Sequence, residues 1–113
     1  MKKVLVVGGS GFLGSHTADE LTRRGYAVSI LDRAESPWRI PAQKMHLGDL
    51  LDQEILDRVM KDIDVVYHFA GVADINEASG RPLETINLNV SGTAQIVDTA
   101  VRARVKRFVF AST

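Results

Sequence analysis

Residues 4–16, VLVVGGSGFLGSH, place four glycines directly behind a run of four apolar residues. The apolar run has strand composition, and the residues from Gly11 to Arg24 have the spacing of an amphipathic helix closed by Gly25. Glycines allow a sharp turn and a close approach of the backbone to a ligand, because they carry no Cβ. A helix N-terminus directs unpaired N–H groups at such a ligand, typically a phosphate. The segment therefore predicts a strand, turn and helix that together bind phosphate.

The same opening has some features of a secretory signal, since Lys2 and Lys3 precede the apolar run. However, that run ends after four residues, and no cleavage-like site precedes the charged stretch around Asp19 and Arg24. No later segment approaches the roughly 18 apolar residues of a membrane span. We expect a soluble, cytoplasmic chain with no membrane partner.

Charge and cysteine content exclude several function classes. Lys+Arg and Asp+Glu both number 14 in 113 residues, which argues against a nucleic acid or an anionic membrane as partner, because both need a basic field. The chain has no cysteine, and its three histidines lack metal-ligand spacing. We therefore predict no metal site.

Short apolar runs alternate with longer amphipathic stretches along the whole chain. We predict strands over 3–7, 27–31, 44–47, 65–70 and 107–111, and helices over 11–24, 53–62 and 83–104. The last helix carries Ile86, Val90, Thr93, Val97 and Val101 at the spacing of one helix face. Strands that are apolar throughout are typical of a parallel sheet covered on both faces. The fold class is therefore α/β: a Rossmann-type, doubly wound parallel sheet of about five strands, in one domain over 1–113.

The glycines match two dinucleotide-binding spacings. Gly8, Gly11 and Gly14 form G-x-x-G-x-x-G, and Gly9 replaces Gly8 in G-x-G-x-x-G. Such a motif carries weight only where it follows a strand and opens a helix, as it does here. It predicts a pyrophosphate at the carboxyl end of the first strand.

Asp32 stands at the end of the second predicted strand, 18 residues beyond Gly14. A carboxylate there accepts hydrogen bonds from the adenosine ribose hydroxyls and repels a 2′-phosphate. The cofactor is therefore predicted to be NAD. NADP is the minor alternative, because the neighbouring Arg33 is a candidate partner for a 2′-phosphate.

With these residues in view, the whole chain resembles the extended short-chain dehydrogenase/reductase family, in its NAD-dependent nucleotide-sugar epimerase/dehydratase branch. GGSGFLGSH resembles the glycine signature of that branch more closely than the generic pattern, and GDLLD (48–52) resembles its adenine-contacting segment. The resemblance implies that Asp49 and Leu50 contact the adenine. It also implies cofactor contacts from the glycine segment, at Gly8, Gly11, Phe12, Leu13 and Gly14.

Three later segments extend the resemblance. HFAG (68–71), as found in UDP-galactose 4-epimerases, implies that Phe69, Ala70 and Gly71 line the cofactor ribose and pyrophosphate. NVSGT (89–93) resembles the N-x-x-G-T of the family, with Asn89 as the matching asparagine. KRFVFAST (106–113) resembles the fifth strand, which implies Thr113 as the catalytic hydroxyl and Ser112 beside the nicotinamide.

Each segment also has a purely structural interpretation. Asp49 would be the N-cap of a helix beginning near Leu51. Asn89 would tie two loops together, Gly71 would end a strand, and Ser112 and Thr113 would be an ordinary stretch of chain.

The family reaction uses a Tyr-x-x-x-Lys pair, in which the tyrosine acts as general acid/base. The tyrosines here are Tyr26 and Tyr67, followed four residues later by Ile30 and Gly71. We therefore expect the NAD-binding half of a longer enzyme, inactive by itself, whose intact form acts on a nucleotide sugar. Two other functions stay open, a non-catalytic NAD-binding module and a hydroxysteroid- or flavonoid-type reductase. A homodimer also stays open.

Overall fold

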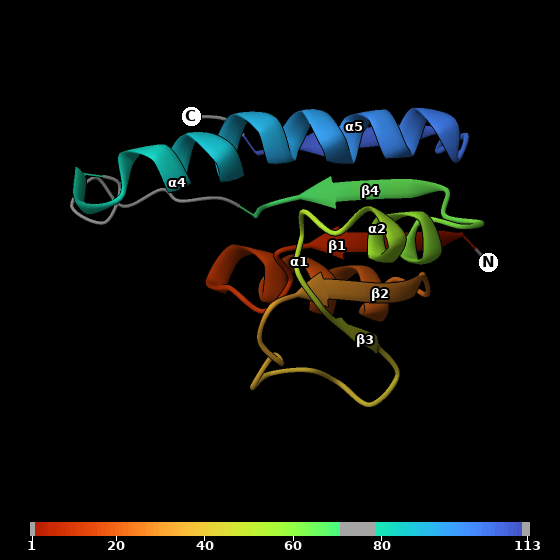
Figure 1. The fold of residues 1–113 in the computed structure, drawn as a ribbon. Coiled ribbons are helices and arrows are strands. Elements are labelled where there is room, and N and C mark those ends of the chain that lie inside the picture. The colour runs from red at the N-terminus through yellow and green to blue at the C-terminus, as the bar shows by residue number, and fades with distance from the viewer. Residues whose placement is uncertain (1, 71–78, 112–113) are drawn as a thin grey trace.

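The structure is a computed structural model that describes residues 2–70 and 79–111. Within these residues five parallel strands form one sheet in the order β3-β2-β1-β4-β5 (Figure 1). The strands are β1 (Lys3–Val7), β2 (Ala27–Asp32), β3 (Lys44–Leu47), β4 (Val65–His68) and β5 (Arg107–Phe110). The helices are α1 (Phe12–Arg23), α2 (Gln53–Val59), α4 (Pro82–Ile86) and α5 (Gly92–Arg102), with a π-helical segment η1 (Asn87–Ser91) between the last two. This is the predicted Rossmann-type sheet.

The order of the strands sets the place of the site. β1 pairs with β2 on one side and with β4 on the other, so the direction in which strands are added reverses at β1. Ligands of open parallel sheets bind at the carboxyl ends of the strands beside such a reversal. The glycine segment follows β1 at that edge.

Helices cover β1 on both faces, which explains why this strand is apolar from Val4 to Val7. Val4 and Val6 pack in one core cluster with Ala18 and Leu21 of α1. The alternate residues of β1 pack in the other cluster, which contains residues of α2 and α5: Leu5, Val7, Leu31, Leu50, Leu56, Val59, Met60, Ile63, Val66, Ile96 and Ala100.

The ends of the elements differ modestly from prediction. α1 ends at Arg23, and Gly25 follows with φ +91°, the left-handed conformation that glycine adopts at helix ends. α2 ends at Val59 and β4 at His68, earlier than predicted. The predictions at Gly71, Ser112 and Thr113 fall outside the described residues.

The long helix predicted over 83–104 differs more from the structure. It is divided into α4, η1 and α5, and its apolar stripe faces outward: Ile86 is 55%, Val90 63% and Val101 71% exposed. The buried face of α5 instead consists of Gly92, Ile96, Thr99 and Ala100. Three of these four residues are small or polar, so a hydrophobic periodicity cannot identify the face.

Candidate cofactor site

Gly8 joins the carboxyl ends of three strands. Its N–H donates to the Leu31 carbonyl at the end of β2, at 2.8 Å. Its φ is +84°, and a Cβ there would lie 2.6 Å from the backbone nitrogen of Ala70, just beyond β4. A side chain at Gly8 is therefore excluded by the close approach of two backbone segments.

The other two glycines of the motif have different roles in the structure. A Cβ on Gly14 would overlap the carbonyl oxygen of Gly8 and lie 2.8 Å from Cα of Gly9, so α1 packs directly on the turn. A Cβ on Gly11 would meet only the Gly8 oxygen, at 3.6 Å, which is an ordinary contact. The protein itself does not require glycine at 11. The space that Gly11 leaves open is what a bound group would use.

The N-terminus of α1 has the properties of an anion site. The N-cap is Gly11, so no side chain caps this end, and the first turn contains no acidic residue. The first N–H groups of a helix have no partner within it, and they lie at the positive end of the helix dipole. Phe12 and Leu13 in this turn are 77% and 55% exposed. The site therefore fits a pyrophosphate, which would accept hydrogen bonds from these N–H groups.

Asp32 ends β2 beside the glycine turn. Its carboxylate accepts from the N–H of Ser10 at 3.1 Å and from the N–H of Arg33 at 2.7 Å. The Ser10 hydroxyl in turn donates to the Ala34 carbonyl at 2.6 Å. Ser10 thus links the turn to the carboxylate, a role that the motif spacing does not reveal because Ser10 stands at one of its unspecified positions. The Arg33 side chain is exposed.

The turn after β3 lies next along the same edge, since the N–H of Gly48 donates to the Asp32 carbonyl at 3.1 Å. Asp49 accepts from the N–H of Leu51 at 2.9 Å, within the turn. The interpretation of Asp49 as a helix N-cap is wrong. The N-cap of α2 is Asp52, whose carboxylate accepts from the N–H groups of its first turn.

Leu50 departs from the picture of a side chain against an adenine. Its side chain is 3% exposed and packs in the core cluster on the α2 side. Only the backbone of Leu50 therefore remains to face a ligand, whereas Asp49 is exposed.

The β4 side of the edge is held to the helix layer through His68. Its Nε2 lies 3.0 Å from the hydroxyl of Thr93, and burial lowers the pKa of the imidazole, which favours the neutral ring. Phe69 continues the strand with an N–H that donates to the Val7 carbonyl at 2.8 Å. Asn89 lies partly buried in η1, four residues before Thr93. π-Helical turns recur at functional sites.

The structure therefore brings most of the predicted cofactor residues to one edge of the sheet. Those at or beside the ends of β1, β2, β3 and β4 are Gly8, Gly11, Phe12, Leu13, Gly14, Asp32, Arg33, Asp49, Leu50, Phe69 and Ala70. Across residues 2–70 and 79–111 no group of three His, Cys, Asp or Glu side chains is arranged to hold a metal ion. No helix in this part of the chain is long and apolar enough to cross a membrane.

Comparisons with known proteins agree with this geometry. The sequence model of the NAD dependent epimerase/dehydratase family matches residues 4–113. The UDP-glucose 4-epimerase of Neisseria meningitidis serogroup C is 39% identical, over 99% of this chain and 37% of its own length. The UDP-glucose 4-epimerase of Klebsiella pneumoniae is 38% identical, over 97% of this chain and 88% of the relative. The chain thus spans a little over a third of the Neisseria relative, at 37%.

Solved structures are similar over the same region. The UDP-glucose 4-epimerase from Brucella ovis in complex with NAD has a TM-score of 0.90 and 36% identity, over 99% of this chain and 36% of its own. The Thermotoga maritima UDP-glucose 4-epimerase with UDP-glucose has a TM-score of 0.92 and 27% identity, over 98% of this chain and 38% of its own.

Proposed function

Since the chain belongs to the NAD dependent epimerase/dehydratase family, we propose that it binds NAD and supplies the cofactor-binding portion of a nucleotide-sugar epimerase or dehydratase. The observation that carries the proposal is the open, uncapped start of α1 at Gly11, next to the carboxylate of Asp32. The first attracts a pyrophosphate and the second a ribose diol.

The cofactor would extend along the edge in the order of the strands. Its pyrophosphate would accept from N–H groups at Phe12 and Leu13, in the gap that Gly11 leaves. Asp32 would accept from the adenosine ribose hydroxyls, which places the adenine beyond β2, toward the turn after β3. Asp49 and the backbone of Leu50 would line that turn.

The nicotinamide half would lie on the other side of β1, toward β4 and β5. Phe69, Ala70 and Gly71 follow β4, and Asn89 lies in the helix layer held to β4 through Thr93 and His68. Ser112 and Thr113 follow β5 in the sequence, and we propose Thr113 as a hydroxyl that hydrogen-bonds the substrate oxygen. When bound, NAD supplies a hydride acceptor for a sugar carbon.

These 113 residues contain no Tyr-x-x-x-Lys pair. Tyr26 directly precedes β2, at the amino end of the strands and therefore opposite to Asp32. Tyr67 packs partly buried against the α1 side of the sheet, with Gly71 four residues later. Neither phenol is placed to take a proton from a substrate at the carboxyl edge, so we propose that the chain alone has no turnover.

Calorimetric titration of NAD and NADP into the chain tests the cofactor assignment. We expect NAD to bind more tightly, because the Asp32 carboxylate repels a 2′-phosphate. Asp32→Asn should lower the affinity for NAD about tenfold or more, since a hydrogen bond to a charged group contributes roughly 1.5–3 kcal/mol. Glu35→Gln removes one negative charge from an exposed residue of the same loop and is the matched control. Equal affinities for NAD and NADP in the parent chain would refute the assignment.

A further inference from the structure

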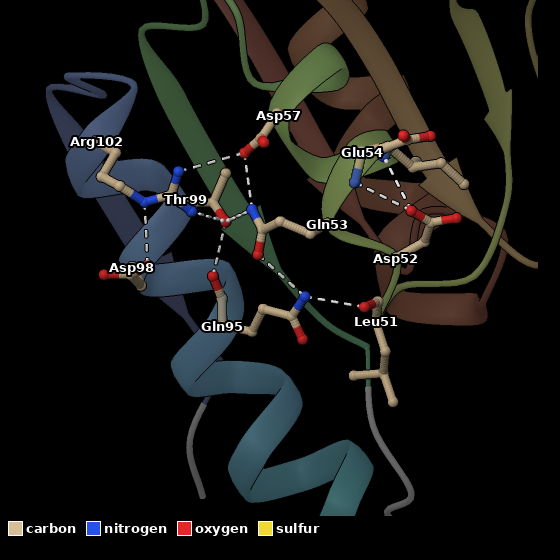
Figure 2. Close-up of polar contacts among 10 residues, drawn as sticks. Leu51, Asp52, Gln53, Glu54, Asp57, Gln95, Asp98, Thr99 and Arg102 are labelled. Atoms are coloured by element: carbon tan, nitrogen blue, oxygen red, sulfur yellow. Dashed lines mark hydrogen bonds and ion pairs between the residues drawn. The ribbon is translucent and has the colours of Figure 1, made fainter.

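The turn of residues 48–52 joins β3 to α2, and its two ends are held by different partners. At its start, the N–H of Gly48 donates to the Asp32 carbonyl at 3.1 Å. Within it, the N–H of Asp52 donates to the Asp49 carbonyl at 3.1 Å, so the turn is closed on itself. Near its end, the carbonyl of Leu51 accepts from the side chain of Gln95 at 2.9 Å (Figure 2). Gln95 belongs to α5, 44 residues later in the sequence.

The Gln95 amide is held in one orientation. Its Nε2 donates both to the Leu51 carbonyl and, at 3.1 Å, to Oε1 of Gln53, which uses both amide hydrogens. Figure 2 shows Gln53 lying between Gln95 and Thr99. The Gln53 Nε2 donates to the Thr99 hydroxyl at 2.9 Å and to Asp57 at 2.7 Å, which leaves its Oε1 directed at Gln95.

Thr99 fixes this arrangement from within the helix layer. Its side chain is 1% exposed, and its hydroxyl donates to the carbonyl of Gln95 at 2.8 Å. The same hydroxyl accepts from Gln53, so α2 and α5 share a satisfied polar contact beneath the turn. A buried polar group with all its partners present holds a single geometry. Gln95 is partly buried, and its two hydrogen bonds to Leu51 and Gln53 make it a support for the turn.

We propose that Gln95 is a positioning residue for the adenine end of the cofactor. The inference rests on the proposed function, under which the adenine lies against the turn after β3. By holding the Leu51 carbonyl, Gln95 fixes Asp49 and the backbone of Leu50, and through Gly48 it also supports the end of β2 at Asp32. Both hydrogen bonds of its amide are made to Leu51 and Gln53, so Gln95 would act on the ligand through the turn.

The same part of α5 also contacts the other half of the edge. Thr93, two residues before Gln95, pairs with His68 at the end of β4. Loss of the Gln95 contact leaves this pair in place, so it should affect the adenine half of the cofactor and spare the nicotinamide half. A general loss of stability would instead weaken both halves alike.

The test is the affinity of the chain for AMP and for nicotinamide mononucleotide, measured by saturation-transfer NMR titration alongside NAD. Gln95→Met keeps the length of the side chain and removes the amide. We expect AMP and NAD to bind about fivefold more weakly, because the turn loses the neutral hydrogen bond that Gln95 donates to the Leu51 carbonyl. The affinity for nicotinamide mononucleotide should be unchanged. Gln95→Lys restores a donor for the Leu51 carbonyl and should recover most of the AMP affinity. Asp98→Asn, on the exposed side of α5 where it pairs with Arg102, should change neither ligand.

Within one sample, the ratio of the AMP affinity to the nicotinamide mononucleotide affinity does not depend on the folded fraction. Partial unfolding of Gln95→Met therefore cannot produce the expected result. An unchanged ratio in Gln95→Met, or failure of Gln95→Lys to recover AMP binding, overturns the positioning role. A parent chain that binds none of the three ligands instead counts against the proposed function.

Discussion

Gly11 and Gly14 allow one substitution, glycine to valine, to separate ligand binding from folding. At Gly14 the new Cβ would overlap the backbone oxygen of Gly8 and lie 2.8 Å from Cα of Gly9. Both obstacles are backbone atoms that cannot rotate away, so overpacking of about 1–3 kcal/mol is expected. Each kcal/mol lowers the Tm of a domain of this size by roughly 4–8 °C. Gly14→Val should therefore be several degrees less stable or unfolded.

At Gly11 the same change meets only one protein atom, at 3.6 Å, and the φ of −79° suits any residue. The fold should lose no more than the roughly 0.5–1 kcal/mol that distinguishes glycine from an aliphatic N-cap. The isopropyl group would, however, fill the space before the N-terminus of α1. Loss of even one charge-assisted hydrogen bond to the pyrophosphate, roughly 1.5–3 kcal/mol, weakens NAD at least about tenfold.

Thermal unfolding and calorimetric titration of NAD on the two variants give the result. The expected outcome is Gly11→Val with near-parental Tm and much weaker NAD binding, and Gly14→Val with a depressed Tm. Parental NAD affinity in Gly11→Val would show that the open space is not the phosphate position. A Gly14→Val chain as stable as the parent would show that α1 does not pack on the turn as described.

Two further predictions concern pH and activity. Burial lowers the pKa of His68, so the unfolded chain binds more protons below about pH 6.5, and stability should be full above that pH and decrease as the pH falls. Burial and the nearby Lys44 and Arg58 also lower the pKa of His46, so His46 contributes a loss of stability of the same sign. In urea unfolding, His68→Gln should therefore reduce, but not abolish, the difference in free energy of unfolding between pH 7.5 and pH 5.5. An undiminished difference would exclude His68 as a source. The purified chain, supplied with NAD, should convert no UDP-, GDP- or dTDP-sugar when the sugar products are separated by chromatography, because loss of general acid/base catalysis alone costs typically 10²–10⁴-fold. Turnover abolished by Thr113→Ala would mean that these residues include their own catalytic base.

The sheet could be predicted because its signals are local. The run VLVV and the turn after it determine β1 and α1, since a strand buried on both faces needs apolar residues throughout and a helix packed on a turn needs glycine at the contact. Asp32 followed from its position at the end of a strand. These features depend on residues within one or two elements, which is the range that sequence patterns describe.

What the sequence did not reveal depends on contacts between distant segments. Val90 and Val101 face outward because Gly92 and Ala100 are on the buried side of the helix, which no hydrophobic periodicity encodes. The sequence suggested Asp49 as a cap, and the backbone path of the turn makes Asp52 the cap instead. The contact of Gln95 with a carbonyl 44 residues earlier has no local signature at all.

The pairing of β1 with β4 has a consequence for the order in which the protein is made. Lys3 and Asp64, 61 residues apart, join the two strands at one end, so the central strand is synthesised long before its second neighbour. At roughly 5–20 residues per second, the ribosome needs about 3–12 s to bridge that interval. During this interval, one edge of β1 has no partner strand, and its unpaired backbone groups are open to association with other chains. The approach of Ala70 to Gly8 also comes only after β4 docks, so the turn after β1 gains its last backbone neighbour only in chains that have passed this stage. Under the proposed function, cofactor binding during translation would therefore favour nascent chains in which β4 has already paired with β1.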